Sequence, residues 1–437
     1  MNGSLVANLG VGPETWLILS LLSCLTLFFK FSRILSVRNL DLLLLFALTP
    51  AMMSLMRYGH TRDWGAFLWL FLGSALWLAR CVIDLGLARR PILEPNLNVA
   101  GLACLAIGVL GLLVAETVSL PVEDGSARNP ADPLGKPGLS GEPPKDVSKD
   151  LDPHIKTMLR NPHLPVLFRR SPPQVILSRI LACLAHIGLG AGLLVIGWRH
   201  FGRPVAGLAT ATCYLLMPYT RIALVDSTQL VPAALIVAAI STYTSPIWAG
   251  VLIGLAAGWM PACLSLVPLW AGFYRRRGAR RFAIMCLGVV AVCAATRWLI
   301  PGVSDWGRAL GARTLAEVGL LPTLEPTAIG GFWAGIEPSY RIPVLIAHLA
   351  LVLVTSYWPA EKDLGTLIAL SAALLVSSQF WYLGAGGTLV LLYLPLVLLM
   401  MFRPNLSAKR PAIQPSRRAR SEEPAFPSMT VGDGRST

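Results

Sequence analysis

The chain has 437 residues, of which 54% are hydrophobic and only 14% are charged. An ordinary soluble domain carries about 25% charged residues, so these charges cannot cover the surface of a soluble chain of this length, and soluble classes are excluded. The apolar residues form recurring blocks of about 16 to 25 residues, which predict an all-α, polytopic transmembrane helix bundle with about 12 to 13 crossings. A β-barrel is excluded because it would show short strands of alternating polarity.

The net charge of +14 comes from lysines and arginines that flank the apolar blocks. A nucleic-acid-binding domain would gather such residues on one surface, so we expect membrane lipids as partners and no nucleic acid. The eight cysteines lie in or at the edges of apolar blocks and form no CxxC pair. This pattern favours buried thiols over a disulfide framework or a thiolate zinc site. We predict no metal site, and a requirement for a divalent metal stays open.

The N-terminal region, 1–118, is expected to contain four transmembrane helices, at approximately 16–31, 39–56, 64–79 and 98–118. The first block does not resemble a signal peptide, because no Lys or Arg precedes it and Lys30 and Arg33 follow it. We therefore expect it to be retained as a span. The next region, 119–173, has eleven prolines, eight Lys or Arg and seven Asp or Glu, which predicts an extended, Pro-rich outward loop.

The central region, 174–299, contains apolar blocks at approximately 174–198, 204–219, 228–244, 246–274 and 282–299. The block 246–274 decides the topology. If it crosses twice, as two short halves that turn near Gly258–Pro261, there are about 13 crossings with the N-terminus outside, and every basic cluster is cytoplasmic. Pro261 favours such a break because it lacks a backbone donor. A single tilted helix would give about 12 crossings and place three basic clusters outside, so we prefer the first topology.

The rest of the chain is expected to comprise an outward loop with an interfacial helix (300–341), C-terminal spans (342–402) and a disordered basic tail (403–437). The arginines of the tail and the cluster Arg275–Arg281 place the C-terminus in the cytoplasm. We expect a multi-pass protein of a bacterial inner membrane. Its oligomeric state stays open.

Ionisable residues near the membrane are informative because burying them in lipid is costly. Most of the candidates lie at the outer ends of predicted spans, namely Glu116, Glu123, Asp124, Arg179, Arg221, Asp226, Arg297, Tyr340 and Arg341. A transporter would place such groups near the midplane, at breaks in helices. Their position at one surface favours an enzyme that acts on a lipid headgroup. His186 and His348 lie within spans and are expected to form hydrogen bonds between helices.

Segment 174–281 carries an ordered series of features. They are Arg179 near the start of a helix, the turn Trp198–Pro204, then Pro218, Arg221 and Asp226, the glycines Gly250, Gly254 and Gly258, and a basic turn. In their order and expected side of the membrane, these features resemble the GT-C superfamily of membrane glycosyltransferases, which use polyprenyl-phosphate-linked sugars.

The resemblance implies transfer of a hexose or pentose from a polyprenyl-phosphate donor to an acceptor at the outer face. It places the essential acid in the first outer loop, where Glu123 and Asp124 are the candidates. Such a carboxylate takes the proton of the acceptor hydroxyl as that group attacks the anomeric carbon, and cations stabilise the leaving phosphate. The residues expected to bind the donor phosphate or the substrate are Arg179, Arg221, Asp226, Tyr340 and Arg341.

Two other functions are compatible with the sequence. One is a non-catalytic polytopic membrane protein, as a degenerate relative or an assembly factor, and the other is a transporter. The enzyme requires Asp124, or Glu123 in its place, to converge with Arg221 on an outward cavity, with Asp226 or Arg341 nearby. The carboxylate and guanidinium would then lie about 6–12 Å apart, on either side of the sugar. A transporter would instead have a midplane cavity.

Overall fold

The computed structural model describes residues 13–58, 64–87, 95–119, 173–276, 278–300, 302–313, 332–333, 336–382, 386–404 and 406. Within these ranges every regular element is a helix, which confirms the prediction of an all-α bundle. Five of these helices are long and apolar enough to cross a membrane. The chain is therefore a multi-pass integral membrane protein.

The N-terminal group of helices comprises α1 (Pro13–Phe28), α2 (Val37–Ala47), α3 (Thr49–Tyr58), α4 (Trp64–Ile83) and α5 (Val99–Ser119). Ser36 caps α2, because its hydroxyl accepts a hydrogen bond from the backbone N–H of Asn39. Helices α2 and α3 follow each other directly and together supply one apolar span, Val37–Leu55.

The central group comprises α7 (Pro173–Val195), α8 (Pro204–Leu216), α9 (Pro218–Ile222), α10 (Ser227–Ser241), α11 (Pro246–Trp259), α12 (Leu266–Phe273) and α13 (Ala279–Leu299). Helix α7 continues into a π-helical turn, Ile196–His200, and a 3-10 turn, Pro261–Ser265, precedes α12. Several of these helices begin with proline at the first helical position, where its missing N–H costs nothing.

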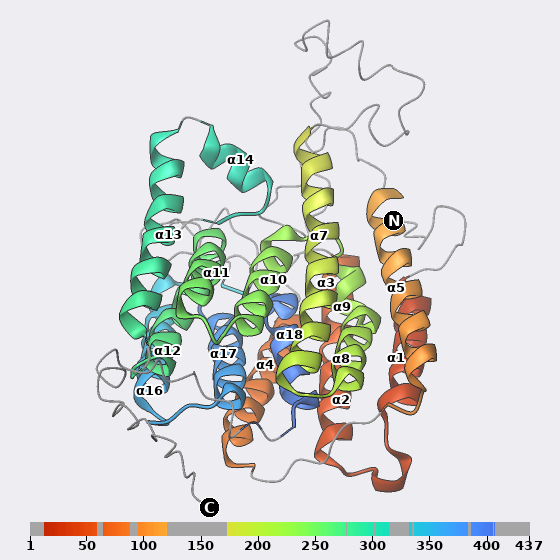
Figure 1. The fold of residues 1–437 in the computed structure, drawn as a ribbon. Helices are drawn as coiled ribbons and strands as arrows, with labels where there is room; N and C mark the ends of the chain where they lie inside the picture. The colour runs from red at the N-terminus through yellow and green to blue at the C-terminus, as the bar shows by residue number, and fades with distance from the viewer. Residues whose placement is uncertain are drawn as a thin grey trace, which may run out of the picture.

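The last group comprises α14 (Val303–Ala309), α16 (Arg341–Tyr357), α17 (Leu364–Ser378) and α18 (Val390–Phe402). Helices α17 and α18 form the centre of the bundle, and nearly all of their side chains are buried (Figure 1). Helix α14 occupies the start of the predicted second outward loop. Most of that loop, almost all of the predicted loop 119–173 and most of the C-terminal tail lie outside the described residues.

The two ends of the bundle differ in charge. The helix ends and connections at one end, here called the basic end, carry Lys30, Arg80, Arg199, Arg203, Arg275 and Arg403, and the other is called the distal end (Figure 1). In the described ranges the chain passes between the ends in the order α1, α2 with α3, α4, α5, α7, α8, α10, α11, α12, α13, α16, α17 and α18. Their number equals the 13 crossings of the preferred topology, in which block 246–274 is counted twice, and the side that each end faces stays a prediction.

The break within block 246–274 is confirmed. Helix α11 ends at Trp259, Met260 is extended, and the chain resumes as a 3-10 turn at Pro261. Helix α12 brings the chain back to the basic end, so α11 and α13 run parallel, with Gly250 against Phe282 and Gly254 against Cys286. A Cβ at either glycine would lie 2.7 Å from a carbonyl oxygen of α13, so these glycines allow the close contact.

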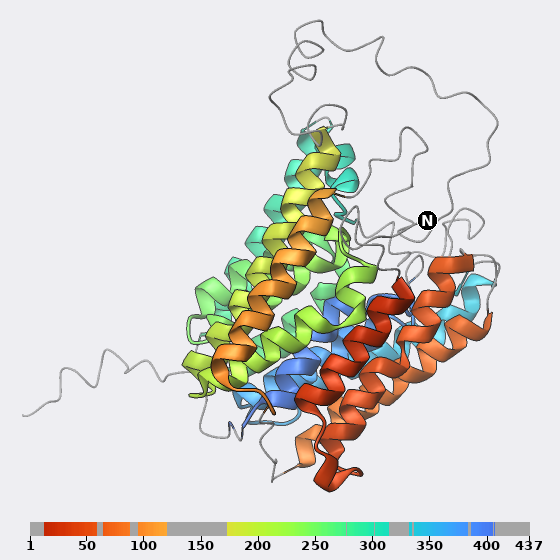
Figure 2. The ribbon, with the colours of Figure 1, turned by 90° about the vertical axis from the view of Figure 1, so that its right-hand side faces the viewer.

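The helices of the bundle differ in length. A helix of 14 residues, such as α11, measures about 21 Å, whereas the 21 residues of α13 measure about 31 Å. Helices α5 and α7 are also long, and they lie side by side in both views of the fold (Figures 1 and 2). The shorter helices therefore end below the tips of the longer ones at the distal end.

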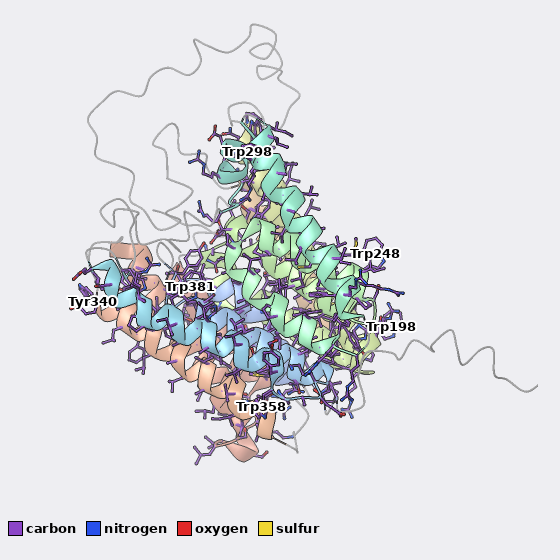
Figure 3. All side chains as sticks on the ribbon, turned by 90° about the vertical axis from the view of Figure 1, so that its left-hand side faces the viewer. Trp198, Trp248, Trp298, Tyr340, Trp358 and Trp381 are labelled. Carbon is purple, nitrogen blue, oxygen red and sulfur yellow. The ribbon has the colours of Figure 1, made fainter. Side chains whose placement is uncertain are left out.

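Exposed aromatic side chains lie on two opposite sides of the bundle. Trp298 and Tyr340 lie on the side of the distal end, and Trp198, Trp248 and Trp358 lie on the side of the basic end (Figure 3). Aromatic residues are enriched at the two membrane–water interfaces. Their arrangement is therefore typical of a bundle that crosses a membrane with these two ends in water.

Candidate functional site

The two predicted catalytic acids, Glu123 and Asp124, lie outside the described residues. The predicted distance between Asp124 and Arg221 therefore stays a prediction. The described part of the chain instead shows the partner of Arg221, which is the acid at the end of α5.

Glu116 and Arg221 form a buried ion pair at the distal end. The Nε of Arg221 lies 3.0 Å from Oε1 and 3.1 Å from Oε2 of Glu116, and both side chains are 8% exposed. Glu116 lies in the last turn of α5, and Arg221 lies on the short helix α9. Helix α8 ends at Leu216, Met217 is extended because it precedes a proline, and Pro218 begins the new helix α9. The ring of Trp16 on α1 covers the guanidinium, with Cζ 5.8 Å from the ring centroid.

Arg179 binds the same turn of α5 from another helix. Its Nη1 donates a hydrogen bond to the carbonyl oxygen of Val118, at 3.3 Å. A helix end leaves its last carbonyl groups without partners inside the helix, and a cation satisfies and stabilises them. Two of the predicted donor-binding arginines, Arg179 and Arg221, are therefore brought to the C-terminal turn of α5.

Asp226 lies nearby in sequence but takes part in a different cluster. It caps α10, accepting hydrogen bonds from the N–H of Thr228 (3.1 Å) and the side-chain amide of Gln229 (2.8 Å). Gln229 in turn binds the backbone of Thr388 and Leu391, which ties α10 to the start of α18. Burial raises the pKa of the Asp226 carboxyl, and these hydrogen bonds and the charge of Arg313 act in the opposite direction.

Arg341 and Tyr340 lie at the start of α16, apart from the Glu116–Arg221 pair and from the Asp226 cluster. Arg341 begins α16 and donates a hydrogen bond to the carbonyl oxygen of Trp381 at 2.8 Å, whereas Tyr340 is exposed. Arg297 donates to the carbonyl oxygens of Gly258 and Arg313, so it closes the C-terminal end of α11. The predicted distal residues that the structure describes therefore divide into an ion pair, a helix cap, three guanidinium groups that bind backbone carbonyls and the exposed Tyr340.

The two histidines within spans form hydrogen bonds between helices, as predicted. The ring of His186 lies 3.0 Å from the hydroxyl of Tyr214 and 3.1 Å from the carbonyl oxygen of Leu224. His348 lies 2.8 Å from the hydroxyl of Ser377. These contacts satisfy buried polar groups in the core.

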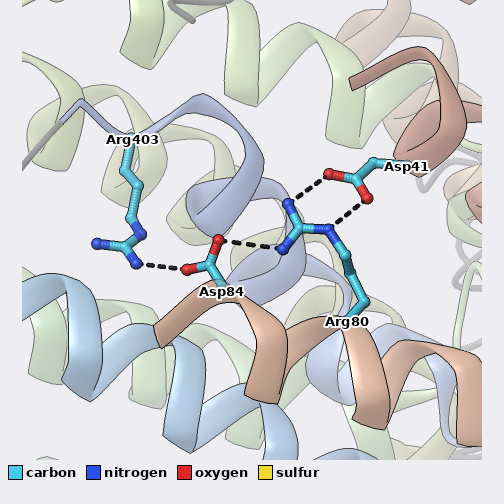
Figure 4. A network of polar contacts seen from close by, with 4 residues as sticks. All are labelled: Asp41, Arg80, Asp84 and Arg403. Carbon is cyan, nitrogen blue, oxygen red and sulfur yellow. Dashed lines mark hydrogen bonds and ion pairs between the residues drawn. The ribbon is translucent and has the colours of Figure 1, made fainter. Parts of the chain in front are cut away.

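A second ionic cluster, at the basic end, was not predicted. Arg80 binds Asp41 through two hydrogen bonds, of 2.6 and 2.8 Å, and its Nη1 lies 3.1 Å from Asp84 (Figure 4). Asp84 also binds Arg403, at the end of α18. Asp41 and Asp84 are almost fully buried. The available signal was an aspartate inside the apolar sequences LDLLLLF and CVIDLGL, where an unpaired acid would be costly.

Gly365 makes room for this cluster. A Cβ added at Gly365 on α17 would overlap the guanidinium of Arg403. The cluster therefore links α2, α4 and α18, and it depends on a glycine of a fourth helix, α17.

Among the residues that the structure describes, no group of three or more His, Cys, Asp or Glu side chains is arranged to hold a metal ion. No family model matches the chain, and no curated protein or solved structure matches it. The fold and these contacts define a multi-pass helical membrane protein with a buried ionic cluster at each end.

Proposed function

We propose that this protein is a GT-C-like glycosyltransferase that moves a sugar from a polyprenyl-phosphate donor to an acceptor at the distal end. The observation that carries the proposal is the buried pair of Glu116 and Arg221. The pair holds Arg221, which belongs to the segment that resembles the superfamily, against the last turn of α5. Helix α5 is the span that precedes the loop 119–173. That loop is where the resemblance locates the essential acid.

In this proposal Arg221 is the cation that binds the donor phosphate and stabilises the charge on it as the sugar leaves. Glu116 is a positioning residue, because a carboxylate bound directly to a guanidinium is a poor general base. Asp124, or Glu123 in its place, takes the acceptor proton. Arg179, at the same turn of α5, adds positive charge near the phosphate, and Asp226, Tyr340 and Arg341 serve substrate binding.

The proposal is tested with purified full-length protein and a set of polyprenyl-phosphate-linked hexoses and pentoses. We expect native mass spectrometry to detect one bound donor, and product analysis to detect loss of the sugar from the lipid phosphate. Free polyprenol without phosphate is the matched control and should not bind. A protein that binds no member of the set would contradict the proposal and favour the non-catalytic function.

If sugar is transferred at the outer face, the distal end must face outward and the basic end must face the cytoplasm. The positive-inside rule predicts this orientation. Asp305 on α14 at the distal end and Arg276 at the basic end are both exposed. With Cys104 replaced by alanine, we expect Asp305→Cys to react with an impermeant maleimide in intact cells. Arg276→Cys should react only after the membrane is opened. The reverse labelling pattern would rule out an outward-facing distal end.

A further inference from the structure

Three turns lie next to one another at the basic end. They connect α7 to α8, α10 to α11 and α12 to α13. The ring of His200, beside the first turn, binds the carbonyl oxygen of Ser241 at 2.7 Å. The hydroxyl of Tyr274, in the third turn, donates to the carbonyl oxygen of Tyr243. The middle turn thus contacts both of its neighbours, so the three turns form one continuous surface.

This surface carries a dense group of exposed arginines, here called the arginine patch, which consists of Arg199, Arg203, Arg275, Arg276 and Arg280. The sequence of the three turns contains no acid, and from Pro173 to Phe282 the single acid is Asp226, at the distal end. Burial lowers the pKa of Lys362, between α16 and α17, and the charge of Arg275 lowers it further. The arginine patch therefore produces a positive field that its own turns do not neutralise.

The arginine patch differs from the ionic cluster at the same end. Arg80 and Arg403 are held inside the protein by Asp41 and Asp84, so their charges are compensated there. The positive-inside rule requires only an excess of basic residues in a connection, without any particular packing. The three turns also contact one another, so their five exposed arginines lie on one continuous surface, which the positive-inside rule does not require.

Exposed tryptophans accompany the arginine patch. Trp198 is 68% exposed and precedes Arg199, and Trp248, at the start of α11, is 62% exposed. Figure 3 shows both side chains on the same side of the molecule. Indole rings settle at the level of lipid headgroups, which places the arginines at the depth of lipid phosphates. A soluble anion would gain nothing from these rings, whereas a lipid contacts both the rings and the arginines.

We propose that the arginine patch binds the headgroups of anionic phospholipids in the leaflet at the basic end. Guanidinium groups bind phosphate oxygens in pairs, and juxtamembrane basic residues strengthen association with anionic lipids. The site lies at the opposite end of the bundle from Glu116 and Arg221, and it does not depend on the proposed transferase activity.

The test uses full-length protein in phosphatidylcholine nanodiscs that contain increasing fractions of phosphatidylglycerol with brominated acyl chains. Bromine quenches the fluorescence of nearby tryptophans, and the contribution of Trp198 and Trp248 is obtained by difference from the Trp198→Phe/Trp248→Phe variant. We expect this contribution to be quenched in a saturable manner, with a clear preference over brominated phosphatidylcholine. The variant Arg203→Gln/Arg275→Gln/Arg276→Gln should bind roughly a hundredfold more weakly, since each arginine contributes about a fivefold factor.

Two controls separate binding from other effects. Arg308→Gln, at the distal end, should leave the quenching curve unchanged, and a Lys replacement of the same three patch arginines should preserve most of the preference and the topology. Quenching without preference for the anionic lipid in the wild-type protein would overturn the proposal. So would equal displacement by millimolar inorganic phosphate, which would indicate a site for a soluble anion.

Discussion

Replacing Arg80 by methionine is expected to destabilise the fold by about 3–5 kcal/mol. Methionine preserves much of the side-chain volume but removes the charge that compensates two acids. Asp41 would lose both of its hydrogen bonds from Arg80, and Asp84 would lose one and retain Arg403 as a partner. Both carboxylates are almost fully buried, so water cannot replace the lost guanidinium. The loss is measured as a shift in the unfolding transition of the purified protein in detergent.

The matched control is Arg308→Met. Arg308 forms an ion pair with Asp305 on α14, but the two side chains are 54% and 69% exposed. Exposed pairs contribute about 0–1 kcal/mol, so this variant should unfold close to the wild type. A further variant, Asp41→Asn/Arg80→Met, removes the most closely paired acid together with the cation and should regain part of the lost stability. If Arg80→Met and Arg308→Met unfolded alike, the cluster would not stabilise the bundle.

The sequence allowed the break in block 246–274 to be predicted because the information is local. Pro261 cannot continue a helix, and each half is too short to cross a membrane alone. The charge distribution then required a second crossing. The first argument uses residues within the block, and the second uses the basic clusters along the whole chain, so neither requires knowledge of which helices pack together.

The ionic pairs could not be predicted in the same way. Glu116 and Arg221 are 105 residues apart, and Asp84 and Arg403 are 319 apart. Each pair depends on helices that become neighbours only in the folded bundle. In the sequence Arg80 is one of the basic residues that flank the apolar blocks, and nothing local indicates that Asp41 on another helix would bind it. Acids within apolar blocks do require a partner, but the sequence does not say which basic residue supplies it.

The contacts of the candidate residues at the distal end could not be fully predicted from the sequence either. The resemblance to the GT-C superfamily implied that Asp226 binds substrate. In the structure its carboxylate caps α10 and binds Gln229, a role that follows from local sequence, because Asp is a preferred residue before the first turn of a helix. Substrate binding by Asp226 is thus a proposal, and in that proposal the same carboxylate also caps α10.

Replacing Arg221 by methionine should lower the rate of sugar transfer roughly 10²- to 10³-fold, the loss typical of removing one preorganised group that stabilises charge in the transition state. Glu116→Gln should have a smaller effect, on the order of tenfold, because the amide still packs in place but no longer fixes the guanidinium by charge. Transfer is followed with labelled donor, and kcat and KM are measured separately at several pH values.

The two variants combined give the decisive comparison. If Glu116 acts only by positioning Arg221, then Glu116→Gln added to Arg221→Met should cost almost nothing more, since residues that act as a unit are not additive. The loss should appear in kcat, and the acidic limb of the pH profile, which reports the base, should keep its midpoint in Glu116→Gln. Asp305→Asn, an exposed acid at the same end, is the control and should transfer at the wild-type rate. Additive losses, or a shifted acidic limb, would mean that Glu116 has a role of its own in the reaction, such as that of the base.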